Sequence, residues 1–215
     1  MDLFDSLNDN TPRKEELGPG IVLLHHFALQ NEEALLAALH EVTAAAPFRH
    51  MVTPGGHRMS VAMTNCGTLG WITDRAGYRY ATIDPESGHQ WPPMPESFLQ
   101  LAQSAATQSG FPNFVPDACL INRYEPGAKM SLHQDKDEQD FQQPIVSVSL
   151  GIPAIFLFGG AQRADKQLRI PLNHGDVIVW GGPARLYYHG IRPLKDDNHP
   201  LLGGYRLNLT FRKAT

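Results

Sequence analysis

The chain has 215 residues, 42% of them hydrophobic and 19% charged, which is typical of a globular protein with a single domain. Its net charge of −4 argues against nucleic-acid binding through overall charge, so such a role would need a local patch. Two cysteines are too few for a disulfide framework, and neither a signal segment nor a bilayer-length apolar run is found, which predicts a cytoplasmic protein.

The first half of the chain predicts a loose start, one strand and two helices. Residues 1–17 are polar and are expected to form a flexible arm, and Ile21–Leu24 reads as a strand. Asn31 followed by two glutamates is typical of a helix start, and apolar residues then recur at helical spacing. A second helix is predicted over 96–109, with an inward face formed by Phe98, Leu101, Ala102, Ala105 and Ala106.

The segment between the two helices, 53–91, is rich in Gly, Pro, Tyr and Thr. We expect two short strands there, at 59–64 and 78–83. After Gly110 the pattern changes to short β-type runs separated by Gly, Pro, Asn and Asp: 118–124, 145–151, 155–158, 168–172, 177–180, 186–189 and 205–212. Many short strands at regular spacing predict a sandwich or barrel, so the fold class is mainly β with flanking helices.

The motif His133-Gln134-Asp135, together with His189, is a candidate metal site. Two imidazoles and one carboxylate leave several coordination positions open on a non-haem Fe(II) ion. In an extended strand residues i and i+2 point to the same face, so His133 and Asp135 are expected to reach one metal while Gln134 turns away. Alone the motif is weak evidence, because H-x-D occurs by chance.

The last strand, Arg206–Arg212, alternates completely between polar and apolar residues. Leu207, Leu209 and Phe211 share one face, and Arg206, Asn208, Thr210 and Arg212 share the other. If the polar face points into a metal-containing jelly roll, its two guanidinium groups need anions, because an unpaired buried charge is costly. A dicarboxylate co-substrate would supply one carboxylate to each arginine.

Four motifs in this order resemble the AlkB family of alkylation-repair dioxygenases. They are N-R-Y-x-P-G at 122–127, H-x-D-x-D at 133–137, H-G at 189–190 and R-x-N-x-T-F-R at 206–212. The resemblance continues upstream through 51–71 and 116–124, and covers nearly the whole chain from about Ile21 to Arg212. Each motif alone is weak, but the ordered set is specific.

The resemblance implies an Fe(II)- and 2-oxoglutarate-dependent dioxygenase on a double-stranded β-helix (jelly-roll) core. By this similarity His133, Asp135 and His189 bind Fe(2+) and form the catalytic centre. Arg206 would hold the distal carboxylate of 2-oxoglutarate, and Arg212 would lie near the carboxylate that chelates the metal. The pocket would be completed by Asn122, Tyr124 and Asn208. The second co-substrate is O2.

The same resemblance implies oxidative demethylation of N-alkylated bases such as 1-methyladenine and 3-methylcytosine. The substrate would be DNA, preferentially single-stranded, with double-stranded DNA and RNA as further substrates. Products would be succinate, CO2, formaldehyde and the restored base. Trp71 and His133 would sandwich the flipped base, and Asp137 would accept from its exocyclic amine. Further substrate contacts are implied for Tyr78, Arg79, Tyr80 and Arg163.

We therefore expect a monomer with an arm at 1–17 and one dioxygenase domain at 18–215. Within it, 18–115 would form an N-terminal extension with a nucleotide-recognition lid, and 116–215 the jelly-roll core. Two alternatives stay open at this point. One is a dioxygenase acting on a small molecule or protein side chain, and the other is a metal-binding jelly-roll protein without catalysis. Trp71 and Asp137 argue against the first, and Arg206 and Arg212 against the second.

Overall fold

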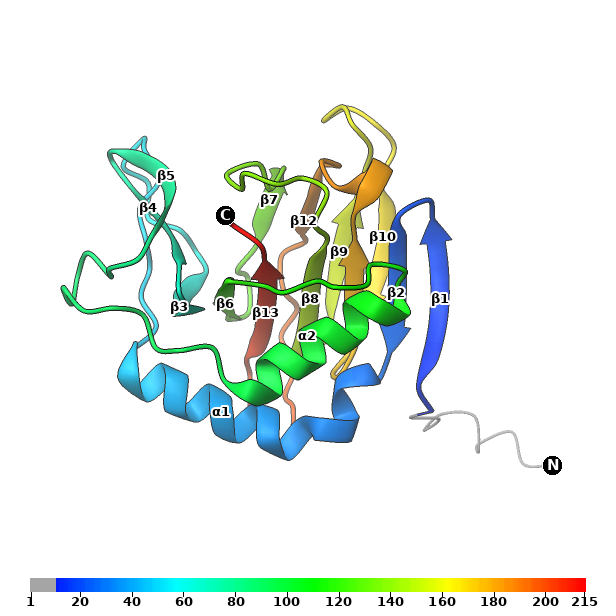
Figure 1. Cartoon of the computed structure of the whole chain (residues 1–215), viewed down its shortest axis with the longest axis horizontal. Coiled ribbons are helices and arrows are strands. Elements are labelled where there is room, and N and C mark those ends of the chain that lie inside the picture. Colours follow the sequence, from blue (N-terminus) through cyan, green and yellow to red (C-terminus); the bar gives the residue numbers. More distant parts are fainter. Residues whose placement is uncertain (1–10) are drawn as a thin grey trace.

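Two antiparallel β-sheets face each other in this computed structural model, which describes residues 11–215 (Figure 1). The larger sheet has the strand order β1 (Arg13–Gly18), β2 (Ile21–His25), β11 (Val177–Trp180), β8 (Ile145–Gly151), β13 (Arg206–Arg212), β6 (Ala118–Tyr124) and β3 (Ala62–Gly67). The smaller sheet has the order β10 (Leu168–Leu172), β9 (Ala154–Phe158), β12 (His189–Ile191) and β7 (Met130–His133). The predicted mainly β fold with a jelly-roll core is confirmed.

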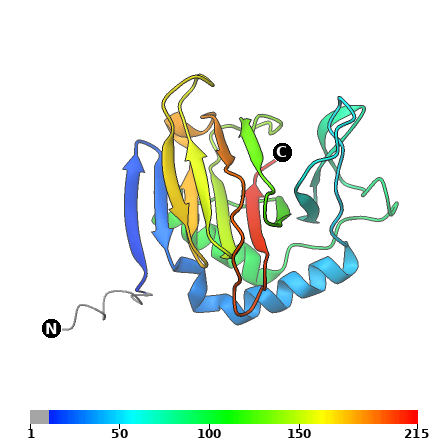
Figure 2. The same ribbon diagram turned by 180° about the vertical axis from the view of Figure 1, so that it is seen from behind.

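Two helices, α1 (Glu32–Ala45) and α2 (Glu96–Gln108), cover the outer face of the larger sheet, while the smaller sheet lies on its other side (Figures 1 and 2). All five predicted inward residues of α2 are buried. The ring of Phe98 meets that of Phe211 edge to face, with centroids 6.0 Å apart. The helix ends as expected, because Gly110 adopts a φ of +90° that continues no helix.

The alternation of β13 places its two faces in different environments, as the sequence predicted. Leu207, Leu209 and Phe211 belong to the apolar cluster between the larger sheet and the helices. The polar face, with Arg206 and Arg212, points between the two sheets, where both arginines line a shared cavity. Because every residue of β13 is buried, the four polar side chains depend on protein or ligand partners.

A separate hairpin, β4 (Gly70–Asp74) and β5 (Gly77–Ala81), projects beside the sheets (Figure 1). Its register places Trp71 opposite Tyr80. The sequence predicted a strand at 78–83 but none at 70–74. Gly70 is required by close approach rather than by strand patterning, because a Cβ there would lie 2.3 Å from the ring of Trp91.

Several predicted boundaries were wrong. Arg13–Gly18 form edge strand β1 against β2 rather than part of a loose arm, because backbone pairing with the apolar β2 outweighs their polarity; residues 1–10 of that arm lie outside the described residues. Strand β12 begins at His189 instead of ending there. The extended segment expected at 133–135 meets only the end of β7, which pairs with β12 and stops at His133. The strand expected at 59–64 is shifted to Ala62–Gly67 by its register with β6.

Neither α1 nor α2, nor any other helix within residues 11–215, has the length and apolar character that a membrane span requires.

Candidate metal centre and its pocket

Strand pairing brings the two predicted histidine ligands together. His133 at the end of β7 lies directly opposite His189 at the start of β12, and their ring centroids are 4.4 Å apart. Asp135 follows two residues later, beyond the end of the strand, with Oδ1 3.5 Å from His133 Nε2 and Oδ2 3.7 Å from His189 Nε2. The candidate ligand atoms all lie within 4.8 Å of one another. The expected convergence is present, although Asp135 reaches it from a loop rather than from a strand.

Hydrogen bonds orient both imidazoles toward the carboxylate. His133 Nδ1 lies 2.9 Å from the carbonyl of Ser131, and His189 Nδ1 lies 2.9 Å from the carbonyl of Tyr187. A carbonyl oxygen only accepts, so each Nδ1 carries the proton and each Nε2 keeps a free lone pair for a metal. Gln134 turns away as predicted, and its amide donates to the Leu186 carbonyl at 2.6 Å.

Charge in the centre is set by Arg212. Its Nε and Nη2 donate to Asp135 Oδ2 at 2.9 and 2.6 Å. Burial would raise the pKa of Asp135, but Arg212 and the two histidines outweigh it and hold that pKa well below its ordinary value. Burial, helped by neighbouring His133, lowers the pKa of His189 to about 4, so this ring is neutral and able to bind a metal at neutral pH.

Arg206 offers an unsatisfied cation in the cavity beside this triad. The residue is 1% exposed, and its Nη2 donates to Ser149 Oγ at 3.0 Å while Tyr124 lies under the guanidinium. Its Nε and Nη1 are buried and have no hydrogen-bond partner among residues 11–215. Burial lowers the pKa of Arg206 from its ordinary value, but the guanidinium stays charged. A buried cation with two free donors fits a carboxylate ligand, and the two imidazoles and the carboxylate nearby fit Fe(II).

Asn122 and Asn208, also predicted to complete the co-substrate pocket, line the same cavity. Asn122 and Asn208 are cross-strand partners in the β6–β13 register, and the Asn122 amide donates to Asn208 Oδ1 at 3.3 Å. Asn208 also donates to Ser147 Oγ and to the Val148 carbonyl, at 2.8 and 3.0 Å. Its amide is therefore used in holding the pocket wall together. The complete lining is Leu120, Asn122, Tyr124, Met130, His133, Asp135, Ser147, Phe156, Trp180, His189, Gly190, Ile191, Arg206, Asn208, Thr210 and Arg212.

The predicted base-binding residues contact one another at the hairpin. The Trp71 indole N–H donates to Asp137 Oδ2 at 2.8 Å, and the Trp71 ring stacks on Tyr78 with centroids 5.7 Å apart. Tyr78, Arg79, Tyr80 and Asp137 also line a second hollow beside the C-terminus. Trp71 and Asp137 thus already satisfy each other.

The two predicted arginine contacts lie in different surroundings. Arg79 forms a bidentate ion pair with Asp74 across the hairpin, with Nη1 3.0 Å from Oδ1 and Nη2 2.6 Å from Oδ2. This ion pair lowers the pKa of Asp74 to about 2. Arg163, in the segment between β9 and β10, is exposed, with its guanidinium 5.1 Å from the ring centre of Tyr188. Their contacts with a substrate stay predictions.

Glu138, Arg185 and Ser149 belong to the site but were not predicted. Glu138 is 6% exposed and Arg185 2% exposed. Glu138 stands in the acidic run 135–140, which by pattern resembles a solvated loop, and Arg185 follows a Gly-Pro turn. A single sequence holds no signal that marks them as buried. Ser149 could have been identified, because it alternates with Ser147 on the inner face of β8.

The chain is similar in sequence and structure to proteins that use Fe(II) and 2-oxoglutarate. The model of the 2OG-Fe(II) oxygenase superfamily matches residues 20–212. The alpha-ketoglutarate-dependent dioxygenase AlkB of Escherichia coli (strain K12) is 58% identical over 212 residues, which cover 99% of this chain and 98% of that protein. The nucleic acid dioxygenase ALKBH1 of Mus musculus is 32% identical over 124 residues, covering 57% of this chain and 31% of that protein. The solved structure of OsALKBH1 superposes with a TM-score of 0.80 at 31% identity, covering 94% of this chain and 100% of that chain.

Proposed function

The chain belongs to the 2OG-Fe(II) oxygenase superfamily and is an α-ketoglutarate (2-oxoglutarate)-dependent dioxygenase, and we propose that it oxidatively dealkylates N-alkylated bases in nucleic acids. The substrates proposed are 1-methyladenine and 3-methylcytosine in DNA, with RNA as a further substrate. One observation carries the proposal most strongly. The metal triad and Arg206, two of whose donors have no partner among the described residues, line one cavity. The ligand Asp135 stands two residues before Asp137, which accepts the hydrogen bond of Trp71.

Each part of the site has a role in this reaction. When bound, Fe(II) and 2-oxoglutarate supply the oxidation of the alkyl carbon by O2, with succinate and CO2 as products. Arg206 binds the carboxylate of the co-substrate that lies away from the metal, because its buried guanidinium keeps N–H donors that no described residue uses. Arg212 fixes Asp135. The apolar wall formed by Phe156, Trp180 and Ile191 excludes water from the reacting groups.

Base recognition follows from the Trp71–Asp137 hydrogen bond. An entering adenine or cytosine brings an exocyclic amine, which can replace the indole N–H as the donor to Asp137. Trp71 is then free to stack on the base, and a cationic methylated ring strengthens both the stacking and the attraction to Asp137. A base with a carbonyl at that position offers Asp137 no donor and is a poorer substrate.

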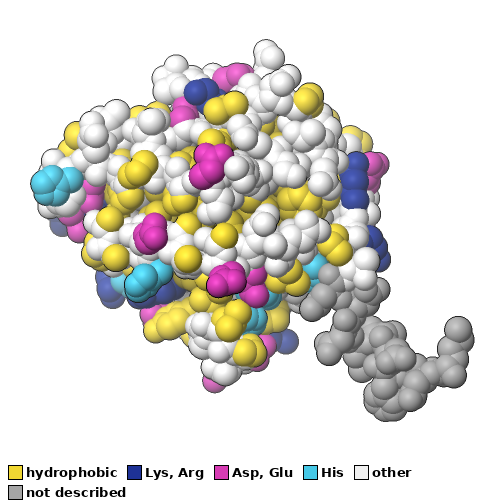
Figure 3. Space-filling model, turned by 60° about the horizontal axis from the view of Figure 1, so that its bottom comes forward, with side chains coloured by type: hydrophobic (Ala, Val, Ile, Leu, Met, Phe, Trp, Pro, Cys, Tyr) yellow, Lys and Arg dark blue, Asp and Glu magenta, His cyan; other side chains and the backbone are white. Residues whose placement is uncertain are grey.

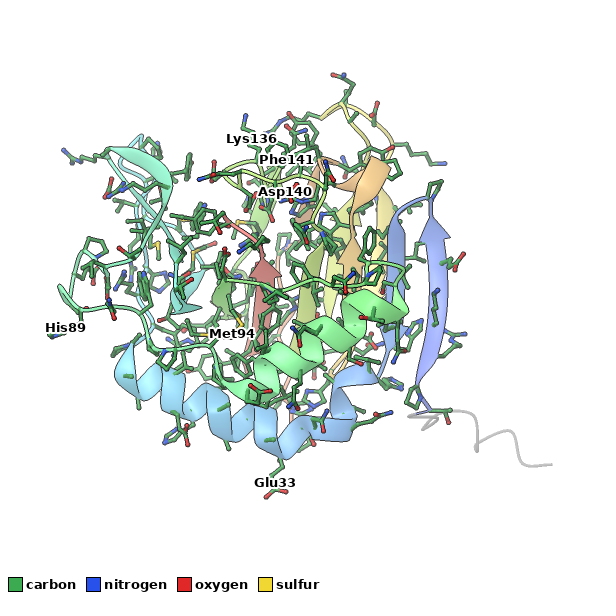
Figure 4. All side chains as sticks on the ribbon, in the orientation of Figure 1. Glu33, His89, Met94, Lys136, Asp140 and Phe141 are labelled. Atoms are coloured by element: carbon green, nitrogen blue, oxygen red, sulfur yellow. The ribbon has the colours of Figure 1, made fainter. Side chains whose placement is uncertain are left out.

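Nucleic acid is proposed to approach the strand ends beside the hairpin. Lys136, Asp140 and Phe141 lie together there, at the opposite end of the molecule from Glu33 of α1 (Figure 4). Figure 3 turns the helix-bearing end forward and shows isolated acidic and histidine side chains among apolar ones, with few lysines or arginines toward its centre. A preference for single strands is proposed because flipping a base out of a duplex costs a few kcal/mol. A cytoplasmic monomer is proposed as well, consistent with two free, buried cysteines.

Incubation of the protein with Fe(II), 2-oxoglutarate, O2 and a 1-methyladenine oligonucleotide tests the proposed function. We expect formaldehyde and unmodified adenine in equal amounts, with faster turnover on the single strand than on the matching duplex. Consumption of 2-oxoglutarate without base repair would instead favour a small-molecule or protein substrate. Absence of 2-oxoglutarate turnover with every substrate would contradict the dioxygenase assignment itself.

Replacing Asp137 by asparagine is expected to lower kcat/KM for 1-methyladenine by about tenfold to a hundredfold, because a charge-assisted hydrogen bond is worth about 1.5–3 kcal/mol. The loss should be much smaller for 1-methylguanine, which presents a carbonyl to Asp137. Substrate-independent turnover of 2-oxoglutarate should be unaffected. Asp196→Asn, at an exposed aspartate of the loop before β13, is the control. Equal losses on both lesions would contradict this role.

A further inference from the structure

The buried carboxylate of Glu138 connects the β4–β5 hairpin to the metal centre. Its side chain is 2% exposed. Tyr80 of β5 donates its hydroxyl to Oε1 at 2.5 Å, and Arg185 Nη2 donates to Oε2 at 3.0 Å. Arg212 Nε lies 3.5 Å from Oε1. One carboxylate therefore contacts a hairpin side chain and two buried guanidinium groups.

Arg185 and Arg212 both also donate hydrogen bonds to the metal ligand Asp135. Arg212 holds the side chain through Oδ2, as described above. Arg185 Nη1 donates to the main-chain carbonyl of Asp135 at 2.8 Å, while its Nε donates to the carbonyl of Gln143 at 3.0 Å. Asp135 lies beyond the end of β7, so strand pairing does not fix it. These two arginines fix it instead.

The formal charges of this cluster balance because Glu138 supplies the second carboxylate. Two guanidinium groups face two carboxylates, and all four side chains are less than one-tenth exposed. Without the Glu138 charge, both cations would be left with Asp135 alone. They would then draw Asp135 Oδ2 away from a metal and place a net positive charge beside the site where a divalent cation binds.

We propose that Glu138 is a positioning residue with two roles. Through Arg185 and Arg212 it fixes Asp135 for metal binding, and through Tyr80 it holds the β4–β5 hairpin in place. The hairpin arm of this proposal rests on the proposed function, whereas the metal arm rests on the triad alone. Metal affinity and hairpin stability thus depend on the same carboxylate, although Tyr80 belongs to one sheet and the ligands His133 and His189 to another.

The test is Glu138→Gln, which keeps the shape and removes the charge. We expect the Kd for Mn2+, a redox-inert probe of the iron site, to rise at least about tenfold. Amide hydrogen exchange of β5 should become faster in the same variant. Asp140→Asn is the matched control, because Asp140 accepts hydrogen bonds from Gln142 and Gln143 within the same loop, and both values should stay within twofold.

Tyr80→Phe separates the two arms. It removes only the hydroxyl, so β5 exchange should become faster while the Kd for Mn2+ stays within twofold. An unchanged Mn2+ affinity in Glu138→Gln, with only the KM for the oligonucleotide altered, would make Glu138 a substrate contact and overturn the proposal. If Glu138→Gln does not fold, the same coupling is tested in the wild-type protein. Mn2+ should slow amide hydrogen exchange of β5 there, and unchanged exchange would overturn the proposal. The Mn2+ affinity and the β5 exchange need no turnover, so these two readouts stand apart from failure of the demethylation assay.

Discussion

Replacement of Asp135 by alanine is expected to abolish turnover, lowering the rate by at least about 10³-fold, or roughly 4 kcal/mol. The reason is that Asp135 is the single carboxylate of the metal triad. The structure adds a second consequence. Asp135 is the buried partner of Arg212, so alanine leaves that guanidinium without its strongest ion pair, and such losses cost about 3–5 kcal/mol. Asp135→Ala should therefore also unfold at a distinctly lower temperature.

Asp135→Asn separates the two effects. Asparagine keeps the shape and an acceptor for Arg212, so it should be destabilised less than alanine while still failing to turn over. Succinate formation, Mn2+ binding and thermal unfolding are the measurements, and Asp196→Asn, an exposed aspartate of the loop before β13, is the control. Turnover within tenfold of wild type in either Asp135 variant would contradict the metal assignment.

Replacement of Arg206 by methionine should remove 2-oxoglutarate binding without a matching loss of stability. Breaking a buried charge pair costs about 2–5 kcal/mol, so the KM for 2-oxoglutarate should rise about thirtyfold or more. The protein without ligand should be as stable as wild type or more stable, because two donors of Arg206 are buried with no partner among residues 11–215. Thermal unfolding with and without 2-oxoglutarate and Mn2+ measures both effects.

The stabilisation that bound 2-oxoglutarate gives to the protein is expected to be large enough to measure. At a ligand concentration of 100 Kd, the wild-type protein should gain about 2.7 kcal/mol, and Arg206→Met should gain almost none. Arg206→Lys should not restore binding, because an ammonium lacks the planar pair of donors. Arg169→Met, at an exposed arginine of β10, is the control. A preserved thermal shift in Arg206→Met would exclude Arg206 from the co-substrate site.

Local pattern predicted the elements whose residues show a clear period. The inward face of α2 and the two faces of β13 were confirmed residue by residue. Three strands were predicted less well, for a common reason. Strand β1 is mostly polar, β4 begins with a glycine and β7 has only four residues, so none shows a clear period. Pairing with a partner strand defines each of them.

The sequence by itself determined the chemistry of this protein: the types and order of the metal ligands, and the inward arginines of β13. Only the tertiary structure decided how these groups are held. It placed His133 opposite His189, paired Arg212 with Asp135, and buried Glu138 between two arginines and Tyr80. The physical reason is that side-chain periodicity encodes which face of an element is buried. The partner that a buried charge meets there depends on strand register and packing between segments far apart in the chain.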